Sequence, residues 1–392
     1  MRYLILFLVI ASACTDAISV NVRDGIERFE AYRNLVKGKR VGIVANHTSR
    51  VDTVHGVDFL LGKGINVVRI FCPEHGFRGT ADAGETVGDY IDAGSGLKVV
   101  SLYGKKKKPQ PEDLSGIDVM IFDMQDVGVR FYTYLSTLHY VMEACAENNK
   151  EFIVLDRPNP NDFVDGPIRQ KGFESFVGVD PLPILHGLTV GELAWMINKE
   201  GWLKSTPDTC RLKIVKMENW KHGDPYWLPV KPSPNLPNDQ SIRLYPSLCF
   251  FEATNVSVGR GTYYPFQVLG FPDPKYGDFT FTPTSLPGFD TNPLQKDKVC
   301  YGIDLREYPF EGGLTLRFFL DFYNKAGKDQ AFFFSRPNWF DLLAGTKQLR
   351  YQIVRGLSEK EIRESWKPEL DQYKAMRKKY LLYPDYPTQN KK

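Results

Sequence analysis

The tetrapeptide Pro73-Glu74-His75-Gly76 places a carboxylate beside an imidazole, directly after the short apolar run 67–72. Both groups can transfer protons in catalysis. A proline-braced turn at a strand end is a poor place for packing, and it suits a side chain that a scaffold must hold for chemistry. We therefore expect Glu74 and His75 to be catalytic, with Glu74 as a general acid or base.

Polar side chains follow three other apolar runs in the same way. The run 40–46 ends in Asn46 and is followed by His47, Thr48 and Ser49. The run 118–126 contains Asp123, Gln125 and Asp126, and Arg130, Tyr132 and Tyr134 come soon after it. The run 151–158 contains Asp156 and Arg157, and Asn159 comes next; Arg78 also follows Glu74 by four residues. Carboxylates, amides, imidazoles and guanidinium groups bind polar ligands and move protons. Asp123 and Asp126 are candidates for a second catalytic carboxylate, and the others, apart from Thr48 and Tyr134, are expected to bind substrate.

These side chains require elements that bring them to one place. Five apolar runs, 40–46, 66–72, 98–104, 118–126 and 151–158, are continuous rather than alternating, which is typical of strands buried on both faces. The segments 53–64 and 132–149 have apolar residues at three- and four-residue spacing and are predicted to be crossover helices. The sequence thus predicts an α/β fold with a Rossmann-like, doubly wound, mainly parallel sheet, whose ligands lie beyond the carboxyl ends of the strands.

Several of these residues also have structural interpretations. Thr48 or Ser49 could cap a helix, and Thr189-Val190-Gly191-Glu192 matches a capping box, which is the favoured role of Glu192. Asp156 and Arg157 could form an ion pair. Three histidines are interpreted as packed or without polar neighbours: His55, His139 and His222.

Composition excludes some classes of protein. The 392 residues are 42% hydrophobic, which favours a globular chain of two domains. The 50 Lys and Arg against 47 Asp and Glu leave a net charge of +3, and the basic residues are scattered except at 105–108, so nucleic acid is not expected as a partner. No glycine-rich nucleotide motif follows any strand, and we expect no cofactor. The cysteines Cys72, Cys145, Cys210, Cys249 and Cys300 are widely spaced, which disfavours a zinc cluster or a dense disulfide framework.

The first fourteen residues predict export. They combine one Arg, a short apolar stretch and the small residues Ala11-Ser12-Ala13, which is typical of a secretory signal. Cys14 directly after them also resembles the lipidation site of a bacterial lipoprotein, although Ala11 replaces the usual Leu. We expect a periplasmic or outer-membrane-associated protein, attached to a membrane only if Cys14 carries a lipid.

The second half of the chain has a different texture. The Pro- and Asn-rich stretch 231–238 suggests a boundary, with an N-terminal domain over 20–232 and a smaller α+β domain over 233–392 that completes the cleft. Beyond it, polar residues alternate with aromatic ones, as in a wall that binds a sugar: Glu252, Asn255, Arg260, Thr262 and Gln267. The segment 358–384 is predicted to be an amphipathic helix that closes the fold.

Several motifs together resemble the NamZ family of exo-β-N-acetylmuramidases. They are VANHTS, PEHGFRG, DMQDVGVRFYTY, LDRPNP, HGLTVGELA, PSPNLPN and FEATNVSVGRGTYYPFQ, and the resemblance runs from about Val22 to the C-terminus. It implies a glycoside hydrolase that removes N-acetylmuramic acid from the non-reducing end of peptidoglycan fragments, with a cleft between a Rossmann-like domain and a smaller one. The segment after residue 267 departs most from the family pattern.

The chemistry that the resemblance implies needs a proton donor and a second carboxylate, or the substrate's own N-acetyl group as nucleophile. Arg130, Arg157 or Arg260 could bind the lactyl carboxylate of muramic acid, with Arg130 as first choice. Two other classes stay open: a non-catalytic protein that binds cell-wall fragments, and a metal-dependent hydrolase. In a metal-dependent hydrolase the metal ligands would be His47, Glu74, His75, Asp123 and Asp156.

Overall fold

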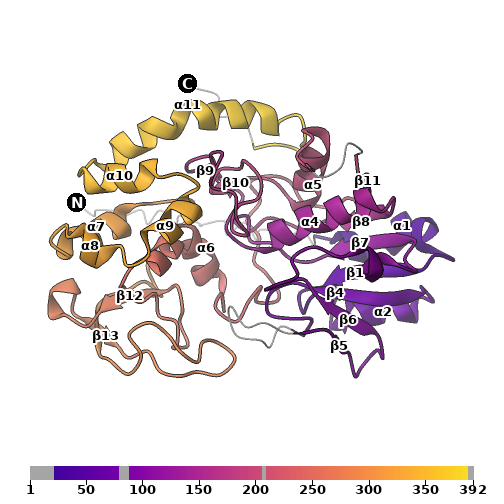
Figure 1. Cartoon of the computed structure of the whole chain (residues 1–392), viewed down its shortest axis with the longest axis horizontal. Helices are drawn as coiled ribbons and strands as arrows, with labels where there is room; N and C mark the ends of the chain where they lie inside the picture. Colours follow the sequence, from indigo (N-terminus) through magenta and orange to yellow (C-terminus); the bar gives the residue numbers. More distant parts are fainter. Residues whose placement is uncertain (1–21, 79–87, 205–208, 387–392) are drawn as a thin grey trace, which may run out of the picture.

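The five apolar runs form the centre of one seven-stranded sheet in the computed structural model, which describes residues 22–78, 88–204 and 209–386 (Figure 1). The strand order is β11-β8-β7-β1-β4-β6-β5. The strands are β1 Val41–Ala45, β4 Val67–Cys72, β5 Tyr90–Ile91, β6 Lys98–Ser101, β7 Val119–Asp123, β8 Glu151–Leu155 and β11 Arg211–Val215. All neighbours pair in parallel except β5 with β6.

The chain adds β4 and β6 on one side of β1, then returns to add β7, β8 and β11 on the other side. This reversal is the doubly wound order of Rossmann-like sheets, so the predicted fold class is confirmed. The sequence prediction missed β11, which is half-exposed at one edge, and β5, which is only two residues long.

Helices cover both faces of the sheet. Ile43 packs in the cluster that contains α1 (Phe29–Val36) and α2 (Gly56–Gly62), whereas the next residue, Val44, packs with α4 (Tyr134–Glu147) and α5 (Val190–Lys199). Successive strand residues point to opposite faces, and both faces are apolar here, which is why the strands are continuous apolar runs. The predicted helices 53–64 and 132–149 appear as α2 and α4. Short elements connect the larger ones: η1 Gly25–Glu27, β2 Arg50–Val51, β3 Val54–His55, α3 Pro111–Leu114, β9 Val164–Asp165 and β10 Leu185–His186.

The C-terminal part combines helices with a small antiparallel sheet of order β12-β14-β13 (Figure 1). Its elements are α6 Asp239–Leu248, η2 Cys249–Ala253, β12 Val268–Phe271, η3 Pro274–Tyr276, β13 Phe279–Phe281, β14 Cys300–Asp304, α7 Arg317–Lys325, α8 Gln330–Phe333, α9 Pro337–Ala344, α10 Gln348–Val354 and α11 Glu359–Arg377. The last helix confirms the amphipathic segment; it begins with a capping box between Ser358 and Glu361.

One hydrophobic core joins the sheet to the C-terminal part. The cluster that contains Phe122 of β7 also contains Phe250 of η2 and Phe319 of α7. Phe131, just after β7, makes edge-to-face contacts with Tyr245 at 5.3 Å and with Phe250 at 5.9 Å between ring centroids. The two parts are therefore packed as one body, and a domain boundary at residue 233 stays a prediction.

The five cysteines from Cys72 to Cys300 are buried and free. Across 22–78, 88–204 and 209–386, no helix is long and apolar enough to cross a membrane. The predicted signal segment 1–14 and Cys14 lie outside the described residues.

Candidate active site

A pocket of about 130 Å³ opens at the carboxyl ends of β4, β6 and β7, where η2 and the loop around Arg260 face the sheet. Glu74 and His75 enter it from the end of β4, Tyr103 from the end of β6, and residues 131–134 from the segment after β7. This is the edge at which ligands bind to doubly wound sheets. The pocket is therefore the candidate active site.

The turn after β4 holds Glu74 and His75 in the pocket wall. The Gly76 N–H donates to the Pro73 carbonyl oxygen at 3.1 Å, and His75 has a φ of +70°, which is uncommon for a residue other than glycine. Such backbone strain is concentrated at functional sites. The tight turn points two adjacent ionisable side chains into one small space.

Two hydroxyl groups orient the Glu74 carboxylate. Thr133, directly before α4, donates from Oγ1 to Glu74 Oε2 at 2.9 Å. Burial raises the pKa of Tyr103, and the charge of Glu74 and a hydrogen bond to it raise that pKa further. Tyr103 therefore stays a protonated donor to Glu74 at physiological pH.

Arg260 forms the opposite wall because two glycines shape its loop. Gly259 and Gly261 have φ values of +79° and +75°. A Cβ on Gly261 would lie 2.5 Å from the Thr284 carbonyl oxygen, so the backbone approaches too closely for any other residue. The VGRGT motif thus has a physical cause: it projects one guanidinium group from a tight loop.

Glu252 fixes one side of this guanidinium group. Arg260 Nε and Nη2 both donate to Glu252 Oε1, at 3.0 and 2.5 Å. Burial lowers the pKa of Arg260, but Glu252 more than offsets this effect and holds it above its usual value. The third nitrogen, Nη1, is buried and has no hydrogen-bond partner among the described residues. A fixed cation with a spare donor remains in the pocket wall.

Two further lining residues have buried polar atoms without a partner among the described residues: Trp339 Nε1 of α9, a donor, and Asn235 Oδ1, an acceptor. Buried polar atoms are normally hydrogen-bonded, and each exception calls for an explanation. A polar ligand in the pocket would satisfy them. Tyr132 and Tyr134 complete the aromatic wall and donate to the Pro232 carbonyl oxygen at 2.9 and 3.2 Å, which anchors the segment that carries Asn235.

Of the predicted site residues, the structure brings five to this pocket: Glu74, His75, Tyr132, Glu252 and Arg260. The others lie outside its lining. Sequence reasoning missed Tyr103, Thr133, Asn235 and Trp339. Tyr103 lies near the end of the third apolar run, just after β6 and at the same sheet edge, so the rule that found Glu74 also applies to it. Trp339 comes from a distant helix and has no local signal.

Asp123, predicted as a catalytic candidate, lies outside the pocket lining and forms a buried ion pair. It is fully buried, accepts from Arg157 Nε at 2.7 Å and also accepts from the Ser49 hydroxyl. Arg157 Nη1 donates to Asp24 at 2.6 Å as well. These two carboxylates compensate the charge of Arg157, and its side chain lies outside the pocket lining.

Asp126 and its neighbours also make local hydrogen bonds at the carboxyl ends of the central strands β1 and β7. Asp126 Oδ2 accepts from the Gly128 N–H at 2.6 Å, and Gln125 Nε2 donates to the Pro158 carbonyl oxygen at 2.7 Å. Asn46 Oδ1 accepts from the Thr48 N–H and hydroxyl. Neither Asp126 nor these amides line the pocket, and their predicted roles in catalysis and binding stay predictions.

The remaining predicted residues also have structural partners. His47 Nε2 lies 2.8 Å from the Lys231 carbonyl oxygen, and burial lowers its pKa to about 4, so the imidazole is neutral. Asp156 caps α5 through the Gly191 N–H at 2.7 Å rather than pairing with Arg157. Four more have clear partners: Arg78 with Asp92, Asn159 with Leu188, Asn255 with Phe332, and Gln267 with Asn238.

Arg130 is buried outside the lining of the pocket, and its predicted contact with the lactyl carboxylate stays a prediction. Its buried guanidinium group donates to the carbonyl oxygens of Pro167, Leu182 and Leu343 at 2.9, 2.6 and 2.7 Å. It therefore joins two loops to the end of α9. Within the described ranges, no three His, Cys, Asp or Glu side chains are grouped so as to hold a metal ion.

Comparison with known proteins agrees with this architecture. Residues 41–240 match the model of the N-terminal domain of exo-β-N-acetylmuramidase NamZ, and residues 243–383 match that of its C-terminal domain. The peptidoglycan β-N-acetylmuramidase NamZ of Bacillus subtilis (strain 168) is 40% identical over 377 residues, which cover 90% of this chain and 89% of that protein.

Two crystal structures of DUF1343 family proteins from Bacteroides fragilis NCTC 9343 are similar to this one. One has a TM-score of 0.86 and 43% identity, covering 93% of this chain and 100% of its own; the other has 0.80 and 31%, covering 93% and 99%. Family models that span most of the chain and a relative at 40% identity both assign the chain to one family. The chain belongs to the NamZ family of exo-β-N-acetylmuramidases.

Proposed function

We propose that this protein is an exo-acting glycosidase that releases N-acetylmuramic acid from the non-reducing end of peptidoglycan fragments. One observation carries the proposal: a carboxylate held by two hydroxyl groups, Glu74, lies across one small pocket from the spare donor of Arg260. A terminal sugar that bears a carboxylate needs these two groups, one for the glycosidic oxygen and one for the lactyl group.

The size of the pocket supports action at chain ends. About 130 Å³ is well below the volume of sites that enclose drug-sized ligands, so it suits one terminal sugar. The aromatic wall, with Tyr132 and Trp339, offers apolar faces to the sugar ring, and Asn235 offers an acceptor.

Glu74 is the proposed proton donor to the leaving oxygen. Glu252 is the second carboxylate among the described lining residues, and its Oε1 is occupied by Arg260. Two routes for the second role fit this arrangement: attack by the substrate's N-acetyl oxygen, with Glu252 only fixing Arg260, or assistance by Glu252 Oε2, which accepts from the Cys249 thiol at 3.9 Å.

The test is Glu74→Gln, which keeps the shape of the side chain and removes the proton. Turnover of a chromogenic N-acetylmuramide should fall about 10²–10⁴-fold. Glu151→Gln is the matched control, because Glu151 begins β8 at the opposite edge of the sheet. Thermal unfolding of both variants shows whether they are folded. A folded Glu74→Gln enzyme with less than about a tenfold loss contradicts the assignment, and a wild-type protein without turnover favours a binding protein.

We also propose that the protein acts outside the cytoplasm. The support is the predicted signal over 1–14 and a substrate class found in the cell wall. Mass spectrometry of the mature N-terminus tests this: a diacylated Cys14 indicates a lipoprotein, a start at Thr15 or later indicates a soluble exported protein, and an intact Met1 in the cytosol contradicts export.

A further inference from the structure

A second and larger cavity, of about 630 Å³, lies away from the Glu74 pocket and shares no lining residue with it. Its walls come from β9, the loop 223–226, the end of α11 and residues 385–386. Helix α6 separates the two sites, because Arg243 lines the cavity and Tyr245 lines the pocket. The volume is within the range of sites that bind organic ligands.

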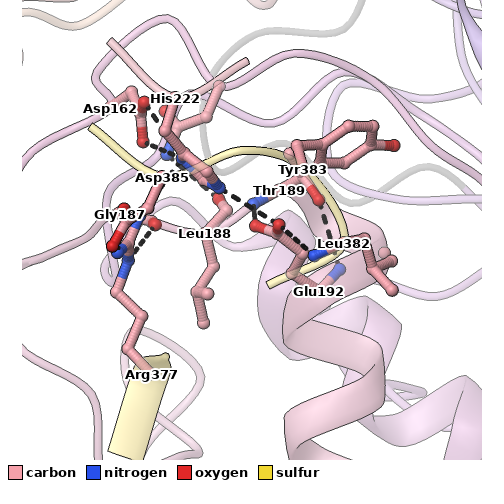
Figure 2. Close-up of polar contacts among 12 residues, drawn as sticks. Asp162, Gly187, Leu188, Thr189, Glu192, His222, Arg377, Leu382, Tyr383 and Asp385 are labelled. Carbon is pink, nitrogen blue, oxygen red and sulfur yellow. Dashed lines mark hydrogen bonds and ion pairs between the residues drawn. The ribbon is translucent and has the colours of Figure 1, made fainter. Parts of the chain in front are cut away.

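A buried hydrogen-bonded network holds one side of this cavity (Figure 2). His222, fully buried, lies between Asp162 at 2.9 Å and Glu192 at 3.1 Å, which corrects the expectation that it has no polar neighbours. Arg377 donates to the Gly187 carbonyl oxygen at 2.5 Å and to Asp385 at 2.8 Å. Asp162, Arg377 and Asp385 line the cavity, so this wall is fixed before any ligand arrives.

Other charges at the cavity have no close ion-pair partner. The side chains of Arg243, Lys374, Lys378 and Glu311 have no hydrogen bond or ion pair with the described residues. The network already compensates Asp162, Arg377 and Asp385, and Asp224 lies 3.9 Å from Lys221. Three cations and one carboxylate therefore remain to meet a ligand.

Apolar surfaces lie between these charges. Phe163 is 40% exposed at the cavity, and Pro160 and Tyr226 also line it. Trp227, 57% exposed, lies beside Arg243, with the guanidinium carbon 6.0 Å from the ring centroid. A ligand that fits has an apolar skeleton as well as charges, unlike inorganic phosphate.

The cavity continues along α11. Val164 and Lys374 also line a neighbouring cavity of about 270 Å³, whose other walls include Trp366 and Lys367. An elongated ligand can therefore extend beyond the first cavity. A compact ligand such as a single sugar would leave this extension empty.

We propose that this cavity is a binding site for a short acidic peptide that carries three carboxylates and one amine. Each carboxylate would meet one of Arg243, Lys374 and Lys378, and the amine would meet Glu311. A stem peptide on muramic acid, acylated alanine–γ-D-glutamate–meso-diaminopimelate, has this set of charges. Naming the stem peptide as the source rests on the proposed function, whereas the site for an acidic peptide does not.

Calorimetric titration of the full-length protein with synthetic N-acetyl-L-alanyl-γ-D-glutamyl-meso-diaminopimelate tests the proposal. We expect saturable binding that is lost when the three carboxylates of the probe are amidated. Lys374→Gln and Lys378→Gln should each weaken binding about two- to fivefold, the usual effect of one exposed ion pair. Lys379→Gln is the matched control, because Lys379 is exposed next to Lys378 and does not line the cavity.

Three results would overturn the proposal: no binding at about 5 mM peptide, equal binding of the amidated probe, or equal affinity of the lysine variants and the control. Turnover of a peptide-free chromogenic muramide should be the same in Lys374→Gln and wild type. Peptide binding by a protein that does not hydrolyse the muramide would contradict the glycosidase and support the cavity. Hydrolysis without peptide binding would do the reverse.

Discussion

Replacing His222 with Gln should remove a pH-dependent part of the stability of this protein. Burial alone lowers the pKa of His222, but Asp162 and Glu192 raise it to about 9. A histidine with a raised pKa in the folded state stabilises the fold fully below its unfolded value of 6.5, and this contribution is lost as the pH rises through 9. At about 1.4 kcal/mol per pH unit, the difference corresponds to about 3 kcal/mol.

Urea unfolding at a series of pH values measures this contribution. The free energy of unfolding of wild type, relative to His222→Gln, should shrink by about 3 kcal/mol between about pH 6 and pH 9.5. Asp156, whose pKa burial raises to about 7, also makes stability fall as the pH rises, but it is present in both proteins and its effect cancels in the difference.

His139→Gln is the control, since His139 is equally buried and lies 2.9 Å from Asp180. Because it retains His222, this variant should keep the wild-type decline with pH. Parallel curves for wild type and His222→Gln would refute the argument, because the network would then hold a neutral imidazole.

Three further substitutions test the site. Arg260→Lys should raise the activation free energy that corresponds to kcat/KM for the muramide by about 1.5–3 kcal/mol and leave slow turnover of the matching glucosaminide almost unchanged. Equal losses of kcat/KM on both substrates would place Arg260 in the scaffold. Thr133→Val, which removes a donor to Glu74, should lower kcat about fivefold with little change in KM, and an unchanged kcat in steady-state assays would contradict that positioning role. Gly261→Ala should lower the thermal midpoint more than Gly327→Ala, because both have positive φ but only Gly261 would clash; equal shifts would remove the steric argument.

The sheet and its ligand-binding edge could be predicted because apolar runs of strand length recur with helices between them. The sequence could not predict which part of that edge stays open to a ligand. Asn46, Asp123 and Arg157 satisfy one another or nearby groups at the central strands, whereas Glu74 lies further along the edge and meets the C-terminal part. Strand-end position is a local property, but pairing at an edge depends on side chains that are more than thirty residues apart.

The two arginines show the same contrast. Arg260 lines the pocket, and the glycines on either side constrain its backbone locally. Arg130 instead donates to the carbonyl groups of residues 167, 182 and 343, and no pattern in a sequence indicates where a long side chain meets distant backbone.

Because the two parts share one hydrophobic core, neither part should fold as a separate fragment. Phe122, Phe250 and Phe319 belong to one cluster, and the pocket takes Glu74 from one side of it and Arg260 from the other. A fragment that ended near residue 240 would expose the apolar surface that η2 and α7 now cover, and it would aggregate rather than fold. Separately expressed halves would therefore show neither stability nor turnover, and evolution could exchange these parts between relatives only as a pair.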